Sequence, residues 1–187
     1  LYTDRPAAND AGKAPSPAAI RGTMIHRLLK RYVERREFPS TTAVEAALKG
    51  EGLSSRNAAR IAPDIMKEAE NTVNAPFISR LLETEGARIY AEWKLEKALS
   101  SSSILSGTVD LVVFDGETWW IIDFKTAAPS DDEDPNRFVE AELGKYRDQL
   151  QSYKTMVEGR LEQGSPFPRC GIFFTALGLW KELSREV

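Results

Sequence analysis

The sequence predicts an α/β fold in which a helical N-terminal segment precedes three strands, a helix and a final strand. Apolar residues recur at helical spacing in the first third of the chain. β-Branched and aromatic residues then fill residues 108–114 and 119–126, on either side of the turn sequence Asp115-Gly116. A stripe of helical spacing over residues 139–162 and an apolar run over residues 169–176 follow. Together these patterns predict one sheet packed against helices.

Length and composition are those of a single globular domain. The chain has 187 residues, of which 42% are hydrophobic and 28% charged, and this is enough for a full core. Residues 1–19 are rich in proline and alanine and predict a linker or disordered arm, so the domain should span residues 20–187. Because the chain begins at Leu1 and ends abruptly at Val187, we interpret it as a piece of a longer polypeptide.

Charge and cysteine content exclude several classes of protein. The net charge of −3 argues against a stand-alone, high-affinity nucleic-acid binder. It leaves room for a local basic patch, formed by Arg27, Lys30, Arg31, Arg35 and Arg36. A single cysteine, Cys170, excludes an internal disulfide and a cysteine-based zinc or iron–sulfur site. No apolar run approaches the roughly 18 residues of a membrane span and there is no signal-peptide pattern, so we expect a cytoplasmic protein.

The region over residues 20–86 is predicted to be mainly helical. Its expected helices cover residues 23–37, with Thr23 as the N-cap, then residues 41–50, residues 54–74 with a weakening or bend at Pro63, and residues 77–85.

The region over residues 87–187 is predicted to form the sheet core with its helix. Residues 88–97 alternate between apolar and polar and predict a strand, and a hairpin over residues 105–126 follows. Residues 127–138 include two prolines and an acidic run over residues 131–134, and they predict an exposed loop. A helix over residues 139–162 then leads to the last strand.

The hairpin carries three charged residues in otherwise apolar strands, and charges are costly to bury unless something compensates them. A four-residue loop would place Asp110 opposite Asp123, and a two-residue loop would make them diagonal neighbours. Either loop puts both carboxylates and Lys125 on one face. The opposite face should be wholly apolar and pack against helices; it comprises Val109, Leu111, Val113, Trp120, Ile122 and Phe124.

Two carboxylates favour a site for Mg²⁺, with Mn²⁺ or Ca²⁺ as alternatives, because these ions prefer oxygen ligands. The backbone carbonyl of Phe124 could fill a further position, and Lys125 could orient a water or neutralise phosphate charge. The structural alternative is an ion pair between Lys125 and one of the two aspartates. His26, the only histidine, is either a metal ligand or a partly buried histidine bonded to the backbone.

Three further residues are candidates for accessory roles. Glu92 lies on the polar side of its predicted strand, where it either faces the site or is solvated. Gln149 and Tyr153 are four residues apart and share one helix face, from which they could bind a phosphate, a base or a water. Their structural alternatives are exposure for Gln149 and core packing for Tyr153.

The motifs in order resemble the RecB-type branch of the PD-(D/E)XK nuclease superfamily, and more narrowly the C-terminal nuclease domain of RecB/AddA helicase–nucleases. The residues that carry the resemblance are Gly22-Thr23-Met24-Ile25-His26, Glu92, Gly107-Thr108-Val109-Asp110, Ile122-Asp123-Phe124-Lys125-Thr126 and Gln149-Leu150-Gln151-Ser152-Tyr153. The resemblance implies a restriction-endonuclease-like mixed sheet flanked by helices. It implies metal ligation by His26, Asp110, Asp123 and the Phe124 carbonyl, a catalytic Lys125, and accessory roles for Glu92, Gln149 and Tyr153.

The resemblance further implies a Mg²⁺-dependent exonuclease that acts on single-stranded DNA in recombinational repair of double-strand breaks. A helicase in the same chain and a second nuclease or helicase subunit would be its partners. Some relatives carry a four-cysteine iron–sulfur cluster, which Cys170 alone cannot build. Tyr90, Tyr146 or Trp119 could stack on bases, or belong to the core. The alternatives are a catalytically silent nucleic-acid-binding or docking module and a hydrolase of another phosphoester.

Overall fold

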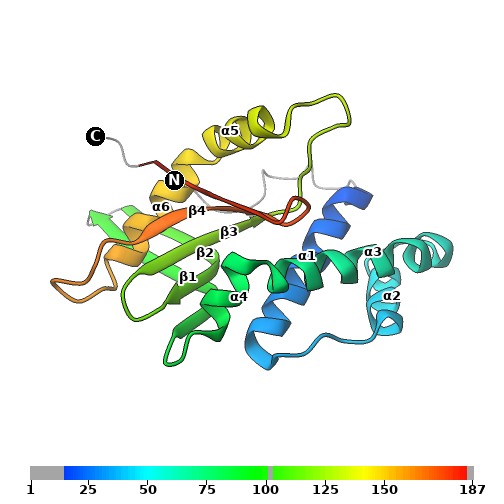
Figure 1. Ribbon diagram of the computed structural model, residues 1–187, viewed down its shortest axis with the longest axis horizontal. Coiled ribbons are helices and arrows are strands. Elements are labelled where there is room, and N and C mark those ends of the chain that lie inside the picture. Colours follow the sequence, from blue (N-terminus) through cyan, green and yellow to red (C-terminus); the bar gives the residue numbers. More distant parts are fainter. Residues whose placement is uncertain (1–14, 101–102, 185–187) are drawn as a thin grey trace.

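A mixed sheet with helices on both faces forms the centre of the protein (Figure 1). The computed structural model describes residues 15–100 and 103–184, and over these residues it contains five strands and six helices. The helices are α1 (Pro17–Arg35), α2 (Thr41–Gly50), α3 (Ser55–Asn74), α4 (Pro76–Glu83), α5 (Pro135–Lys145) and α6 (Arg147–Glu158). The strands are β1 (Arg88–Ser100), β2 (Ser103–Phe114), β3 (Trp119–Lys125), β4 (Arg169–Phe174) and β5 (Leu179–Glu182).

The strands lie in the order β1-β2-β3-β4-β5, and β1, β2 and β3 form an antiparallel meander. Strand β4 pairs with β3 in parallel, and β5 returns antiparallel to β4. A parallel neighbour requires a long crossover connection, and α5 and α6 supply it. The mixed sheet and its N-terminal helices confirm the fold class that the sequence predicts.

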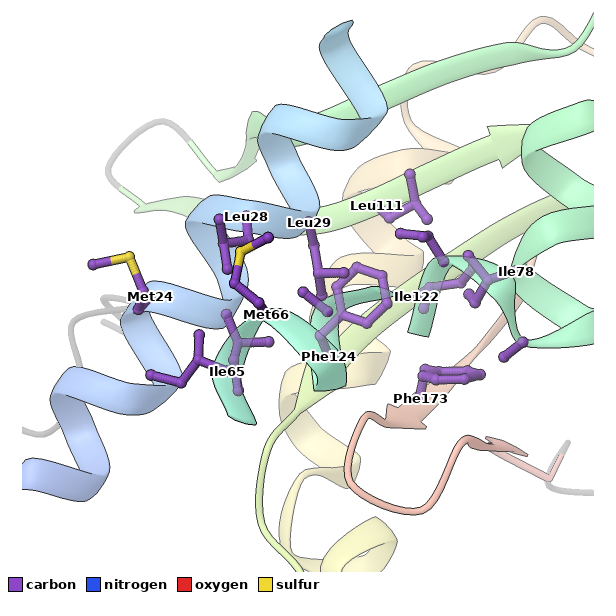
Figure 2. Packing of buried hydrophobic residues seen from close by; sticks show 14 of the residues in the cluster. Met24, Leu28, Leu29, Ile65, Met66, Ile78, Leu111, Ile122, Phe124 and Phe173 are labelled. Atoms are coloured by element: carbon purple, nitrogen blue, oxygen red, sulfur yellow. The ribbon is translucent and has the colours of Figure 1, made fainter. Parts of the chain in front are cut away.

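Each face of the sheet is covered by its own apolar core. On one face, α1, α3 and α4 pack against β2, β3 and β4, with Leu29, Ile65 and Phe124 near the centre of the contact (Figure 2). On the other face, α5 and α6 cover residues that include Val112, Trp119 and Ile121. Strand β3 is buried on both faces, as expected for a central strand with apolar side chains in succession.

The expectation of one apolar face and one charged face is therefore wrong in two respects. The face opposite α1 is itself apolar over most of its area. In addition, Val109 packs with the α6-side core, whereas Leu111 and Val113 pack with the α1-side core. Regular alternation would have placed all three together.

The first helix begins earlier than predicted. Ser16 is its N-cap, with a side-chain oxygen that accepts a hydrogen bond from the Ala19 amide at 3.2 Å, and Pro17 occupies the first turn. Proline is favoured there because its missing N–H would have no partner in a helix. Thr23 is thus inside α1 and not its cap, and residues 17–19 of the predicted arm are helical. Residues 1–14 of that arm lie outside the described residues.

Other boundaries also differ from the prediction. The helix expected over residues 139–162 is two helices, α5 and α6, which meet at Tyr146, and α5 starts within the expected acidic loop at the N-cap Asp134. Helix α3 continues through Pro63, and strand β5 was not predicted. None of the helices in the described ranges is long and apolar enough to cross a membrane.

Candidate active site

The β2–β3 hairpin brings the two predicted carboxylates to opposed positions. Phe114 pairs with Trp119 and Leu111 with Ile122, so the loop has four residues, and Asp110 and Asp123 lie directly beyond the last pair of this register. The loop is held by Asp115, whose carboxylate accepts hydrogen bonds from the Thr118 amide at 2.8 Å and from the Trp120 indole at 2.7 Å. The four-residue alternative from the sequence is thus confirmed.

The neighbouring strand is irregular where it faces Asp110. The register of β1 with β2 places Glu92 opposite Asp110, and Glu92 has a left-handed backbone with φ of 44°. At this point the regular alternation of side chains between the two faces of the sheet is interrupted in both strands. Tyr90 and Trp93, three residues apart, both pack on the α6 side. The reversal leaves Asp110 able to contact α1, which covers the other face.

Asp110 is fixed through both of its carboxylate oxygens. Oδ1 lies 3.2 Å from Nδ1 of His26 on α1, and Oδ2 accepts a hydrogen bond from the Phe124 amide at 2.8 Å. Burial alone lowers the pKa of His26, but its hydrogen bond to Asp110 and the charges of Asp110 and Asp123 outweigh this and raise that pKa above its ordinary value. Among the described residues, His26 is therefore bonded to a carboxylate, whereas the structural alternative for it was a hydrogen bond to the backbone.

Asp123 is the most buried charged group of the site, with 2% of its surface exposed. Its Oδ1 receives a weak hydrogen bond from Gln149 Nε2 at 3.4 Å. Its Oδ2 forms an ion pair with Nζ of Lys125 at 2.7 Å and has no other polar partner among the described residues. Burial, together with the charge of Asp110, raises the pKa of Asp123 to about 7, against the opposing effect of Lys125.

Lys125 is held between Asp123 and an aromatic ring. Its Nζ lies 4.1 Å from the centroid of the Tyr146 ring, at the junction of α5 and α6. Burial lowers the pKa of Lys125, but the charge and contact of Asp123 more than compensate and raise it. The ammonium form is thus the stable one at neutral pH. The Tyr146 ring, one of the three aromatic residues considered for base stacking, contacts this lysine.

The accessory residues lie around this centre. Gln149 donates a hydrogen bond to the Tyr153 hydroxyl at 2.6 Å, and Tyr153 is otherwise buried against β2 at Gly107. Glu92 forms an ion pair with Lys30 at 2.6 Å and lines a small pocket with His26 and Asp110. Glu92 thus faces the site, which agrees with one of the two interpretations of its position in the sequence.

The main chain of Lys125 is anchored by a second polar network that sequence reasoning missed. The Thr175 amide donates to the Lys125 carbonyl at 2.9 Å. The Thr175 hydroxyl donates to Glu68, a buried residue of α3 that also forms an ion pair with Arg21 of α1. This network ties α1, α3 and the end of β4 to the residue that carries the site's ammonium group.

Sequence reasoning placed Lys30 only in a basic patch and missed its contact with Glu92, and it also missed the contact of Tyr146 with Lys125. The position of Lys30 beside the site could have been found, because it lies one helical turn after His26 and so shares its face. Of the predicted basic patch, Arg27, Lys30 and Arg31 are each paired with a glutamate.

The residues present fit a divalent cation, although they do not enclose one as they stand. Among residues 15–100 and 103–184, no three His, Cys, Asp or Glu side chains gather in a metal-binding cluster. However, Asp123 is a buried carboxylate whose Oδ2 has the Lys125 ammonium as its one polar partner among the described residues, and its pKa is raised by burial and by a second carboxylate. A bound cation would compensate both costs, because it supplies positive charge to oxygen ligands.

The mixed sheet brings two carboxylates and a lysine together on the adjacent strands β2 and β3. A family model for the PD-(D/E)XK nuclease superfamily matches residues 2–177, and the chain belongs to this superfamily. A search of curated proteins found no match.

Proposed function

We propose that the protein is a divalent-metal-dependent deoxyribonuclease that hydrolyses phosphodiester bonds at the site of Asp110, Asp123 and Lys125. The observation that carries the proposal is the buried Asp123 carboxylate, with the Lys125 ammonium 2.7 Å from its Oδ2. Membership of a nuclease superfamily supports a nucleic-acid substrate. Buried ion pairs contribute little to stability, which favours a functional role for this one.

We assign metal binding to His26, Asp110, Asp123 and the Phe124 carbonyl. When bound, Mg²⁺ or Mn²⁺ would polarise the scissile phosphodiester and lower the pKa of a coordinated water. The Phe124 amide and His26 orient Asp110 from two sides, at 2.8 and 3.2 Å, so that this carboxylate is positioned before any ion arrives. Preorganised ligands lose little conformational freedom on binding.

The protonation state of Lys125 decides its role in this proposal. Because Asp123 raises the pKa of Lys125, the group donates hydrogen bonds and does not accept a proton at neutral pH. Its ammonium can therefore orient the attacking water and neutralise charge that develops on the phosphate oxygens. Gln149, bonded to Tyr153 at 2.6 Å, holds the Asp123 side of the site.

The finer assignment is also a proposal. We infer an exonuclease of the RecB/AddA type that acts on single-stranded DNA in recombinational repair in the cytoplasm. Its support is the order and spacing of the motifs from Gly22 to Tyr153. A helicase in the same polypeptide and a second nuclease or helicase subunit would deliver the strand.

A cleavage assay tests the proposal. The protein is incubated with end-labelled single-stranded DNA and Mg²⁺ or Mn²⁺, with and without EDTA. We expect EDTA to abolish cleavage and Lys125→Ala to reduce its rate by about 100-fold or more, the loss typical of a removed charge-stabilising donor. Lys67→Ala, an exposed lysine on α3, is the matched control and should retain full activity. Strand binding without cleavage at saturating metal would instead identify the silent docking module.

Metal binding is measured separately by titration calorimetry with Mn²⁺. Asp110→Asn should bind Mn²⁺ more weakly by about 10- to 100-fold, as a neutral amide replaces a charged ligand. Asp64→Asn, an exposed residue of α3, is the matched control. Equal affinity in Asp110→Asn and the wild type would show that the ligand assignment is wrong. A parallel panel of mononucleotide esters and DNA distinguishes a polymer substrate from another phosphoester.

A further inference from the structure

A row of stacked aromatic rings lies on the α6 side of the sheet, outside the proposed catalytic centre. Tyr90 stacks on Trp93 with centroids 4.4 Å apart and an angle of 15° between the rings. The row continues from Tyr90 to Trp119 at 6.4 Å and from Trp119 to Phe114 at 4.9 Å. Strands β1, β2 and β3 all contribute to it.

Two exposed arginines flank this row. The Arg88 guanidinium lies 5.0 Å from the Trp119 centroid and 4.7 Å from the Phe114 centroid. Arg160, which follows α6, donates a hydrogen bond to the Glu96 carbonyl oxygen at 3.4 Å. Within the described part of the chain, neither guanidinium is paired with a carboxylate. Both cations are therefore available to an anion from outside.

Three rings of the aromatic row and both arginines line one pocket of about 300 Å³. Its walls include Arg88, Tyr90, Trp93, Trp119 and Arg160, with Glu162 as the acidic member. Flat aromatic walls beside two cations against one acid suit a ligand that is both planar and negatively charged. A nucleotide unit in a single strand has this combination, because its base has a π face and its phosphate carries the charge.

The reversal of side-chain alternation at Glu92 brings this pocket and the catalytic centre to the two sides of the same stretch of β1. It places Tyr90 and Trp93 on the α6 side, while Glu92 between them lines the pocket of His26 and Asp110 on the α1 side. In the described sheet β1 is an edge strand, with no strand beyond it. A flexible polymer can therefore pass around this edge and contact both pockets, whereas a rigid duplex cannot follow so sharp a path.

We propose that the Arg88–Trp93 pocket, lined by the five residues named above and Glu162, binds unpaired bases of the nucleic-acid strand whose phosphodiester lies at Lys125. This inference rests on the proposed function and specifies how the substrate is held. Stacking on aromatic side chains tolerates every base, and arginines contact the strand through its phosphates. Double-stranded DNA is disfavoured because the faces of its bases are already stacked.

The test is the affinity for a labelled oligothymidylate of about 20 nucleotides, longer than the roughly 4–16 nucleotides that one small binding fold covers. Fluorescence anisotropy in EDTA, which prevents cleavage, compares it with an abasic strand and a duplex of the same length. We expect the wild type to bind the oligothymidylate most tightly. Trp93→Ala and Arg88→Ala should each weaken that binding by about tenfold, and Trp93→Phe should restore most of it.

Two controls match these variants. Arg80 also lies over aromatic rings, 5.5 Å from the Trp120 centroid, but on the opposite face of the sheet. Phe167 is an aromatic residue with 71% of its surface exposed, far from β1 in the sheet order. Arg80→Ala and Phe167→Ala should bind as the wild type does. Circular dichroism verifies the fold of each variant, and the exposed Arg88 keeps the test valid if Trp93→Ala is unstable.

The outcomes separate this inference from the nuclease assignment. If Arg88→Ala and Trp93→Ala bind like the controls, or if the wild type binds the abasic strand as tightly, the pocket assignment is overturned while EDTA-sensitive cleavage can stand. If cleavage is absent but binding depends on bases and on Arg88, the pocket is supported and the nuclease assignment fails. An oligouridylate of the same length shows whether the preferred strand is DNA or RNA.

Discussion

The buried pair of Asp123 and Lys125 should make the metal-free protein less stable than a neutral version of itself. Replacing both partners, as Asp123→Asn with Lys125→Met, removes two charges without leaving either one alone. The raised pKa of Asp123 gives the scale: the difference between its ordinary value of 3.8 and about 7 corresponds to roughly 4 kcal/mol of folding free energy at high pH. Since the lysine loses a partner contact as well, we expect a net stabilisation of about 1–4 kcal/mol at pH 8.

The pH dependence has a definite sign. A carboxyl whose pKa is higher in the folded state binds its proton more tightly there than in the unfolded chain. Its contribution is therefore favourable below the ordinary value of 3.8 and is lost as the pH rises to about 7. His26, whose pKa is also raised, loses stabilisation in the same direction as the pH passes its folded value. The wild type should lose stability between pH 5 and 8.

Urea unfolding in EDTA at pH 5 and pH 8 measures this effect. The free energy of unfolding of the double variant should increase relative to that of the wild type as the pH rises, so that the difference is larger at pH 8. Asp64→Asn with Lys67→Met, an exposed acid and lysine on α3, is the matched control and should change stability by less than about 0.5 kcal/mol at either pH. The reasoning would be refuted if the double variant were less stable than the wild type at pH 8, or if its free energy of unfolding differed from that of the wild type by the same amount at both pH values.

Three further changes test other parts of the structure by urea unfolding. Glu68→Gln should lower the free energy of unfolding by about 2 kcal/mol, because it removes a buried charge from the network that anchors Lys125; its arginine partner is about one-third exposed. The exposed Glu70→Gln should leave the stability unchanged, and equal costs for the two variants would contradict the network. Gly171→Ala should cost about 3 kcal/mol because the added methyl group would overlap the backbone of β5, whereas Gly144→Ala, at an open helical position, should gain up to about 1 kcal/mol. Glu92→Gly should be more stable than Glu92→Ala by about 1 kcal/mol, the reverse of the usual order in a strand, because the position has φ of 44°.

The sequence predicts the hairpin well because local chemistry determines it. Asp115 and Gly116 favour a turn, and the carboxylate of Asp115 bonds to backbone and side-chain groups within five residues. The register of the two strands follows from this loop, and with it the positions of Asp110 and Asp123 directly beyond the last pair. The contacts of Asp123 with Lys125 and of Gln149 with Tyr153 follow from spacing alone in the same way.

The features that the sequence does not reveal depend on distant contacts. Glu92 has an ordinary strand neighbourhood, and nothing local signals that its backbone is left-handed and that alternation reverses there. Glu68 is a charged helical residue next to Lys67, which by itself predicts a solvated side chain, yet it accepts a hydrogen bond from Thr175, which is 107 positions away. The break at Tyr146 was also missed, because the apolar stripe continues through both helices.

Cys170 has a practical consequence for every experiment described above. It is the single cysteine of the chain, 3% exposed on β4, and burial raises the pKa of its thiol well above the ordinary value. Only the thiolate reacts readily with maleimides and related reagents. A second cysteine introduced at an exposed position would thus be modified selectively, without removal of the native one. The natural chain can accept a fluorophore or spin label at a chosen site, so that distances within it become measurable in solution.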